Sequence, residues 1–403
     1  MTRLTAAQID RRIGVIWALL VFNGLGAPTG QVIPRPVAQI FTMGSLVLAL
    51  VLVLTTNRRL LVRPNLVLAL CSIMAVTAAM AGARGLAGVG AAIRSVRLLT
   101  FLGVLWLLTP WWGRNDLLLA RCHLRALVVV SGSVLVGLLL FPSAALRGNA
   151  TGRLSGVLWA IPPTQVGEYA AVLAGMATAM WLSGALARRP ALFIDAVTIS
   201  MVLLSRTRTA LVAALVGVLL AGVTLFLKQK RVRRIAGTVL LLIPLAAVAL
   251  APALSGWFLR NQSSEQIGGL TGRKQVWEHA LAAPRSEFER WFGFGLSDKS
   301  FGGLPIDSTW IAVYQDQGLV GAGLVAATLL EVLVVTAFRR AGPERAVATF
   351  LVVYCIIASY TEVGLGDVSP YLLHVVVAAS LLAGTPWRPS GRPLTASRAP
   401  AVM

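Results

Sequence analysis

Long apolar runs separated by short polar segments repeat along most of the chain. Each run is close to the roughly 20 residues that an α-helix needs to cross the hydrocarbon core of a bilayer. The pattern predicts twelve membrane-spanning helices, at about residues 13–27, 37–56, 65–82, 98–112, 124–142, 168–187, 190–204, 209–227, 235–255, 309–338, 346–362 and 370–385. The expected fold is therefore all-α and polytopic, with one integral-membrane domain over residues 1–385 and a disordered tail over 386–403.

Positive charge alternates between consecutive polar segments. Clusters of Arg and Lys follow every second predicted helix: Arg58, Arg59 and Arg63; Arg114, Arg121 and Arg125; Arg188 and Arg189; Lys228 to Arg234; Arg339, Arg340 and Arg345; and Arg388, Arg392 and Arg398. Basic loops are retained in the cytoplasm. The charge pattern therefore predicts a multi-pass protein of the cytoplasmic (inner) membrane with both termini cytoplasmic.

Composition changes this interpretation little. The 403 residues are 57% hydrophobic and 13% charged, with a mean hydropathy of +0.79, which excludes an ordinary soluble protein. The net charge of +21 belongs mostly to the short clusters that orient the helices, so we expect no nucleic-acid partner. The three His and three Cys are scattered and no phosphate-binding glycine loop is present, so we expect no metal and no cofactor.

Other arginines fall on the opposite, extracytoplasmic side, where retention in the cytoplasm does not explain them. Arg153, Arg206, Arg208 and Arg273 are predicted there, at separate points of the chain. A guanidinium group makes paired bonds to phosphate oxygens, so converging arginines would form a polyanion site at headgroup depth. A single such arginine would instead be an interfacial residue that reaches toward water.

A long extracytoplasmic segment, at about 256–308, separates the ninth and tenth predicted helices. A helix is predicted over 273–283, with Arg273 and Trp277 one turn apart. This pair suits a lipid headgroup or a sugar, and the alternative is a cover helix on the membrane surface. Glu168, Asp307 and Glu362 are predicted on the same side, each as a general base or as the partner of an arginine, with pairing favoured for Glu168 and Glu362.

Three of these segments together resemble the O-antigen ligase and O-antigen polymerase superfamily. They are "LSRTRTALVAALVG", "TGRKQVW" and "GFGLSDKS…PIDSTWIAVYQDQGLVGAG", and "TGRLSGVLWAIPPTQVGEYAAV" is similar to an upstream family segment. The resemblance covers about residues 150–325. It implies a helical membrane glycosyltransferase of the class C type, which moves a glycan from an undecaprenyl-diphosphate carrier to an acceptor hydroxyl outside the cytoplasmic membrane, without a metal.

The same resemblance implies roles for individual residues. Arg208 and Arg273 match the motif arginines that would hold the carrier diphosphate, and Asp307 stands where ligases have a histidine. Asp307 is therefore the predicted proton acceptor, and its difference from histidine leaves a polysaccharide polymerase open beside a ligase. The predicted substrate-binding residues are Arg206, Arg153, Glu168, Trp277 and Trp310, and the partners are the lipid-linked donor, a glycan or lipid acceptor, and membrane lipid.

Two alternatives remain at this point. A transporter or flippase for an anionic lipid-linked glycan would also need extracytoplasmic arginines, but it predicts ionisable residues inside several helices and an internal repeat. The predicted helix interiors are instead nearly all Leu, Val and Ala, and no repeat is evident. A non-catalytic membrane scaffold, with a motif altered at Asp307, is the third hypothesis.

Overall fold

A computed structural model describes residues 5–25, 35–84, 88–114, 116–147, 152–226, 228–235, 237–238 and 273–384. Nearly all of the predicted ninth helix, the first part of the long polar segment and the predicted tail lie outside these residues. Every other predicted span coincides with a helix. The elements are α1 (Ala6–Gly24), α2 (Arg35–Thr56), α3 (Leu66–Ala83), α4 (Gly88–Leu108), η1 (Thr109–Trp111), α5 (Leu118–Leu140), α6 (Pro142–Arg147), α7 (Pro163–Leu182), α8 (Arg188–Ser205), α9 (Arg208–Phe226), α12 (Arg273–Ala282), α13 (Glu287–Phe292), β1 (Ser300–Phe301), β2 (Leu304–Pro305), α14 (Thr309–Phe338), α15 (Pro343–Ala358) and α16 (Pro370–Leu382).

Six of the described helices are long and apolar enough to cross a bilayer. These stretches are Val37–Thr56, Leu66–Ala83, Gly88–Trp111, Leu118–Leu140, Arg208–Phe226 and Thr309–Phe338. Among the other helices, α7, α15 and α16 are largely enclosed by their neighbours. The chain is thus mostly helical, with the apolar helices of a membrane-embedded protein.

The start of α4 differs from the prediction. The fourth predicted span begins at residue 98, which leaves Arg94 and Arg97 in the polar segment before it, but both residues lie inside α4. Their guanidinium groups bond to oxygens: Arg97 donates to the Asn23 side chain at 3.2 Å and to the Asn23 carbonyl, and Arg94 donates to the Leu296 carbonyl at 3.5 Å. Tertiary acceptors therefore compensate charges that appear loop-like in the sequence.

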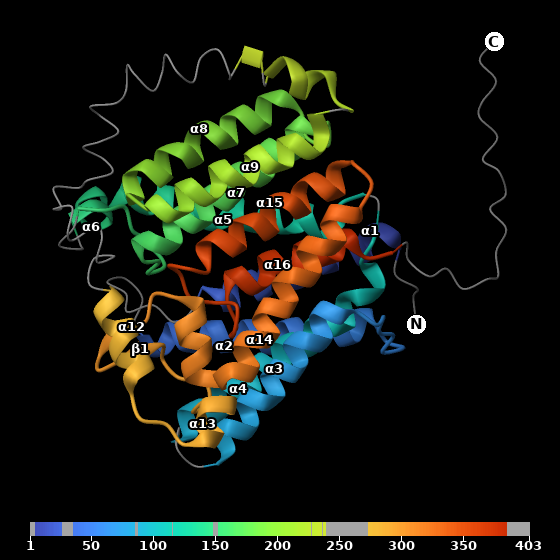
Figure 1. Ribbon diagram of the computed structural model, residues 1–403. Helices are drawn as coiled ribbons and strands as arrows, with labels where there is room; N and C mark the ends of the chain where they lie inside the picture. Colours follow the sequence, from blue (N-terminus) through green and yellow to red (C-terminus); the bar gives the residue numbers. More distant parts are fainter. Residues whose placement is uncertain are drawn as a thin grey trace, which may run out of the picture.

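The polar segments gather at two ends of the helices. In Figure 1, α6, α12 and β1 lie toward one end of the long helices, and the start of α1, in dark blue, lies toward the other. At the end where α1 begins, Arg63 donates to the carbonyls of Trp112 and Gly384, at 3.1 and 3.3 Å. Segments that the charge pattern assigned to one side of the membrane thus meet in space.

The centre of the structure is formed by α16 and α7, with close contacts at small residues. Phe350 of α15 lies between α7 and α9, where a Cβ built on Gly175 would be 2.0 Å from its ring and one on Gly217 would be 2.9 Å away. Small residues allow helices to approach closely in a membrane, where dispersion contacts supply much of the attraction. Glycine at these two positions is what gives the Phe350 ring its space.

We expect Gly175→Ala to lower the stability of the folded protein by roughly 1–3 kcal/mol, the usual cost of overpacking a filled core. The measurement is the midpoint of thermal unfolding of the full chain in detergent. Gly222→Ala is the matched control, because a Cβ at this position of α9 meets nothing within 4 Å. Equal midpoints for the two variants would contradict the packing described for Phe350.

Candidate functional site

The turn between α8 and α9 brings three predicted site residues together. Arg206 has a left-handed backbone (φ +51°) and an exposed side chain, whereas Arg208 is partly buried in the first turn of α9. Arg153 comes from the segment that precedes α7. Its Nε donates to the Ser205 carbonyl at 2.7 Å, and one of its terminal nitrogens donates to Thr207 Oγ1 at 3.3 Å. These contacts hold Arg153 against the turn that presents the other two arginines.

The first residue of α12 and the segment before α14 form an ion pair. Arg273 Nε donates to Asp307 Oδ2 at 3.0 Å. The side chain of Arg273 is 24% exposed and that of Asp307 38% exposed, so both reach the surface of the protein. Two residues of the predicted catalytic set are thus in direct contact.

The segment that joins α15 to α16 connects this ion pair to the α8–α9 turn. Thr309 Oγ1, at the start of α14, donates to the carbonyl of Glu362 at 2.7 Å. Thr361 Oγ1 donates to Thr209 Oγ1 at 2.8 Å, and Thr209 follows Arg208 in α9. The two groups of arginines are therefore linked through adjacent residues of one segment, 361 and 362.

The Glu362 carboxyl group lies among these charges, beyond the end of α15. Burial raises the pKa of Glu362 to about 7; the positive charges of Arg273 and Arg153 oppose this rise, and the Asp307 carboxylate adds to it. A carboxyl group with a pKa near 7 can exchange a proton at neutral pH. Glu362 is thus the group of this region best suited to accept a proton.

Arg153 responds to the same set of charges. Burial lowers the pKa of Arg153; Glu362 opposes the shift, whereas Arg273, Arg206 and Arg208 add to it. The guanidinium groups of Arg206, Arg208 and Arg273 therefore all lie within electrostatic range of Arg153. We call the following six residues the arginine cluster: Arg153, Arg206, Arg208, Arg273, Asp307 and Glu362. With four cations and two carboxylates, this surface favours an anionic ligand of more than one charge.

The two tryptophans of the predicted site lie beside the cluster. Trp277, one turn after Arg273 in α12, makes an edge-to-face contact with Tyr360, with ring centroids 5.5 Å apart. Trp310 Nε1 donates to Ser359 Oγ at 3.2 Å. Both indoles therefore support the 359–362 segment, and the exposed Tyr360 ring adds an aromatic surface next to the cations.

Glu168 lies elsewhere, on the inward face of α7. Its side chain is 4% exposed, and its Oε1 is 3.3 Å from His374 Nε2 of α16. No arginine among the described residues forms an ion pair with Glu168. We expected Glu168 to pair with an arginine, but its side chain contacts His374 instead. The reason is that this face of α7 points toward α16 and not toward the surface.

His374 belongs to a buried polar chain across four helices. Trp17 Nε1 of α1 donates to His123 Nδ1 of α5 at 3.1 Å, and His123 Nε2 is 2.8 Å from His374 Nδ1. Because an indole nitrogen only donates, neutral His123 carries its proton on Nε2 and donates to His374. The proton of neutral His374 is then on Nε2, facing Glu168. These histidines are scattered along the sequence, and nothing in their spacing indicates that they meet.

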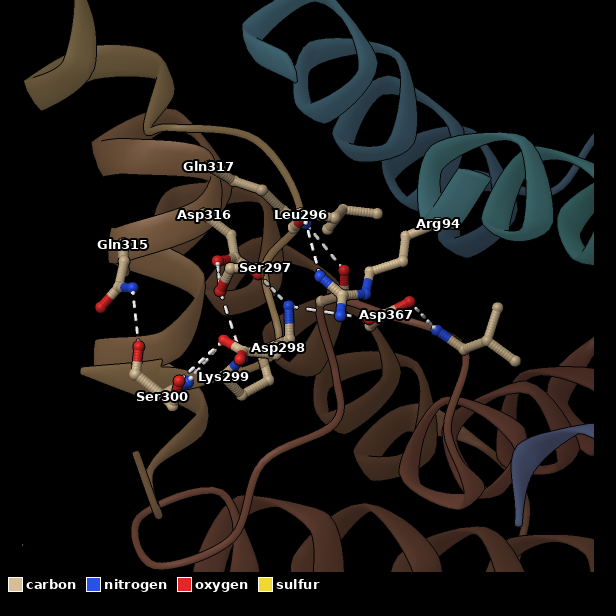
Figure 2. Close-up of polar contacts among 12 residues, drawn as sticks. Arg94, Leu296, Ser297, Asp298, Lys299, Ser300, Gln315, Asp316, Gln317 and Asp367 are labelled. Atoms are coloured by element: carbon tan, nitrogen blue, oxygen red, sulfur yellow. Dashed lines mark hydrogen bonds and ion pairs between the residues drawn. The ribbon is translucent and has the colours of Figure 1, made fainter. Parts of the chain in front are cut away.

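A second polar network attaches the long polar segment to α14. Figure 2 shows Lys299 between the carboxylates of Asp316 and Asp367; Lys299 pairs with Asp316 and is 3.7 Å from Asp367. Ser297 Oγ donates to the other oxygen of Asp316 at 2.7 Å. The Asp316 side chain is 1% exposed, so its charge is compensated almost entirely by these neighbours.

A kink in α14 lies beside this network. Gly318 has a φ of +64°, and a Cβ there would be 2.3 Å from the backbone of Trp291. Trp291 lies at the end of α13, one residue before the last residue of that helix. Only glycine combines this dihedral angle with so close an approach. The kink allows the segment after α13 to bond to α14: Phe294 N donates to Gln315 O at 3.0 Å and Gly295 N to Asp316 O at 2.8 Å.

Asp316→Asn is expected to loosen this attachment, because removing one partner of a buried ion pair costs roughly 3–5 kcal/mol. The amide protons of Phe294 and Gly295 should then exchange with solvent at least about tenfold faster, since 1.4 kcal/mol corresponds to a factor of ten. Hydrogen exchange read by mass spectrometry measures this. Asp298→Asn is the control, because Asp298 is exposed and an asparagine there still has a side-chain oxygen that accepts the hydrogen bonds from Ser300. Equal exchange in both variants would exclude a structural role for the Asp316 charge.

The part of the chain that the structure describes contains no preformed cluster of metal-binding side chains. No group of three or more His, Cys, Asp and Glu side chains there is arranged to hold a metal ion. The arginine cluster has an excess of positive charge, which suits an anion.

Comparison with known proteins assigns no family to the chain. Neither a protein-family model nor a curated protein matches it. The candidate site is therefore interpreted from its own residues, which are a surface cluster of cations with an aromatic ring beside it and one carboxyl group that titrates near pH 7.

Proposed function

We propose that the protein is a membrane glycosyltransferase that moves a glycan from a polyprenyl-diphosphate carrier to an acceptor hydroxyl. The observation that supports this most strongly is the arginine cluster, in which four guanidinium groups and two carboxylates lie near one another at one end of the helices. A diphosphate on a membrane-embedded carrier would meet such a surface at headgroup depth. The motif resemblance to O-antigen ligases and polymerases points to the same chemistry.

In this mechanism an acceptor hydroxyl attacks the anomeric carbon while the diphosphate leaves. Arg208 and Arg273 stabilise the negative charge that builds on the leaving diphosphate, as preorganised donors do in other transfer reactions. Arg153 and Arg206 add positive charge beside it. Glu362 accepts the hydroxyl proton, because its pKa near 7 leaves it deprotonated in part at neutral pH.

Asp307 has a different place in this proposal. Its carboxylate accepts a hydrogen bond from Arg273 Nε, which leaves the terminal nitrogens of that guanidinium group for phosphate oxygens. We assign Asp307 to positioning Arg273, and Glu362 takes the base role that the sequence motif had indicated for Asp307. The two carboxylates then have separate functions within one cluster.

The membrane arrangement that goes with this function has about twelve spans in the cytoplasmic membrane. Both termini are then cytoplasmic, the long polar segment lies between spans nine and ten, and the arginine cluster faces the extracytoplasmic side. The basic segments that alternate with the predicted spans support this orientation. The glycan is then transferred after its carrier has crossed the membrane.

A second candidate function is transport or flipping of an anionic lipid-linked glycan. The buried chain of Trp17, His123, His374 and Glu168 favours it, since ionisable groups inside a helical bundle are typical of proton-coupled transporters. The purified protein, reconstituted in vesicles without any ion gradient and given carrier-linked glycan and acceptor, distinguishes the two. Glycan joined to acceptor supports the transferase, whereas movement of the carrier without joining supports the transporter.

Deletion of the gene tests the function in the cell and separates two kinds of transferase. Accumulation of carrier-linked single repeat units would identify a polymerase, and accumulation of complete carrier-linked chains would identify a ligase. Surface and carrier-linked glycans that are unchanged by the deletion would contradict both.

A further inference from the structure

A groove of about 680 Å³ runs between α1 and α5, on helices that contribute nothing to the arginine cluster. The two helices lie side by side and begin at the same end. Arg114, just before α5, pairs with Asp10 in the second turn of α1 at 2.6 Å, and Trp17 further along α1 bonds to His123 further along α5. The groove therefore starts at the N-terminal ends of both helices and continues toward their middle.

The end of the groove near the helix N-termini carries uncompensated positive charge. Asp10 and Asp116 are the carboxylates that line it, and both pair with Arg114, at 2.6 and 2.5 Å. Three further arginines line the same end with exposed side chains: Arg11, Arg121 and Arg125. Within the described residues, none of these three forms an ion pair. The N-termini of α1 and α5 add their partial positive charge at this end.

The rest of the groove is apolar. Its walls include Val15, Ala18 and Phe22 on α1 and Val129 on α5. The axial rise from Val15 to Phe22 is about 10 Å at about 1.5 Å per residue. Half of a hydrocarbon core of about 30 Å is about 15 Å, so the apolar walls accommodate the upper part of one acyl chain within a single leaflet.

We propose that this groove is a binding site for an anionic phospholipid. The phosphate group contacts Arg11, Arg121 and Arg125, and one acyl chain lies along Val15, Ala18 and Phe22. Basic pockets between membrane helices, continuous with an apolar surface, are the usual sites for acidic lipid headgroups. Such a lipid would fill the space between α1 and α5 in the leaflet at which both helices begin.

The terminal segments of the chain do not complement this site. Residues 1–4 and 385–403 contain arginines but no Asp or Glu, so they bring positive charge toward a positive groove. An acidic lipid supplies both the negative charge and the apolar length that the groove lacks.

The test is retention of lipid by the full-length protein. Protein purified in mild detergent is incubated with phosphatidylglycerol or with phosphatidylcholine of the same chain length, and bound lipid is counted by native mass spectrometry. The triple variant Arg11→Gln, Arg121→Gln and Arg125→Gln should bind phosphatidylglycerol roughly 10- to 100-fold more weakly, because each arginine near an acidic headgroup contributes favourably. The matched control is Arg188→Gln, Arg189→Gln and Arg340→Gln, which removes three exposed arginines away from the groove and should bind as the wild type does.

A variant that leaves the charges unchanged tests the acyl-chain path separately. Ala18→Trp places an indole in the groove and should also reduce binding of phosphatidylglycerol, with all three arginines present. Equal retention of phosphatidylcholine and phosphatidylglycerol by the wild type would overturn the proposal. An equal loss of phosphatidylglycerol binding in the triple variant and in its control would also overturn it, since the overall positive charge of the protein would then explain the binding.

Discussion

Arg273→Gln is expected to lower the rate of glycan transfer by roughly 10²–10³-fold, the usual effect of removing one donor that stabilises transition-state charge. Arg273 is partly buried and held by Asp307 through Nε, so its terminal nitrogens are aimed by an existing contact. Glutamine has neither the charge nor the paired donors. Transfer between carrier-linked glycan and acceptor by purified enzyme measures the effect, and Arg208→Gln should fall in the same range.

The neighbouring residue provides the control. Lys274 follows Arg273 in α12, is 64% exposed and pairs with Glu278 of the same helix at 3.8 Å. Lys274→Gln removes the same charge from the same segment and should leave the rate within about a factor of two, since exposed ion pairs contribute at most about 1 kcal/mol. If Lys274→Gln and Arg273→Gln lose activity equally, the arginine acts only through the general charge of the surface.

Glu362→Gln is the second large effect that we expect, with a loss of roughly 10²–10⁴-fold in the rate of transfer, the range for a general base. Glutamine keeps the size of the side chain but accepts no proton. Glu278→Gln is the control, because it removes an exposed carboxylate of α12 that lies outside the cluster. Asp307→Asn should cost less than Glu362→Gln if Asp307 only positions Arg273. The reverse order would return the base role to Asp307.

The pH dependence of the wild-type enzyme follows from the same carboxyl group. Burial raises the pKa of Glu362 to about 7, so the group is protonated and inactive as a base at lower pH. The rate should therefore rise with pH, reach half of its maximum near pH 7 and level off roughly one pH unit higher. In Glu362→Gln this rise should disappear. A wild-type rate that already reaches its plateau at pH 5 would show that the essential base is a carboxylate with an ordinary pKa.

Much of the helical framework follows from the sequence because apolar runs of membrane length are a local property. The bounds of α14 match the prediction at both ends, and α12 begins at Arg273 as the Gly and Thr residues before it indicated. The proximity of Arg206, Arg208 and Arg273 to Arg153 agrees with the sequence pattern, since alternation of the predicted spans assigns all four to the same side.

Other features depend on contacts that have no local pattern. Arg94 and Arg97 lie inside α4 because oxygens of Asn23 and Leu296 accept their hydrogen bonds. Glu168 faces α16, since the face of a helix that turns inward depends on which helices pack around it. The burial that gives Glu362 its pKa near 7 likewise comes from neighbours distant in sequence.

The sequence by itself determined that the protein is a helical membrane protein and where most of the described apolar helices lie, because hydropathy acts locally. The tertiary structure decided which residues meet. It brought the turn after α8, the start of α12 and the segment after α15 into one cluster. It also brought Arg11, Arg121 and Arg125 together at a groove, where no carboxylate of the described residues pairs with them. Convergence of this kind follows from helix packing, in which residues far apart in the chain become neighbours.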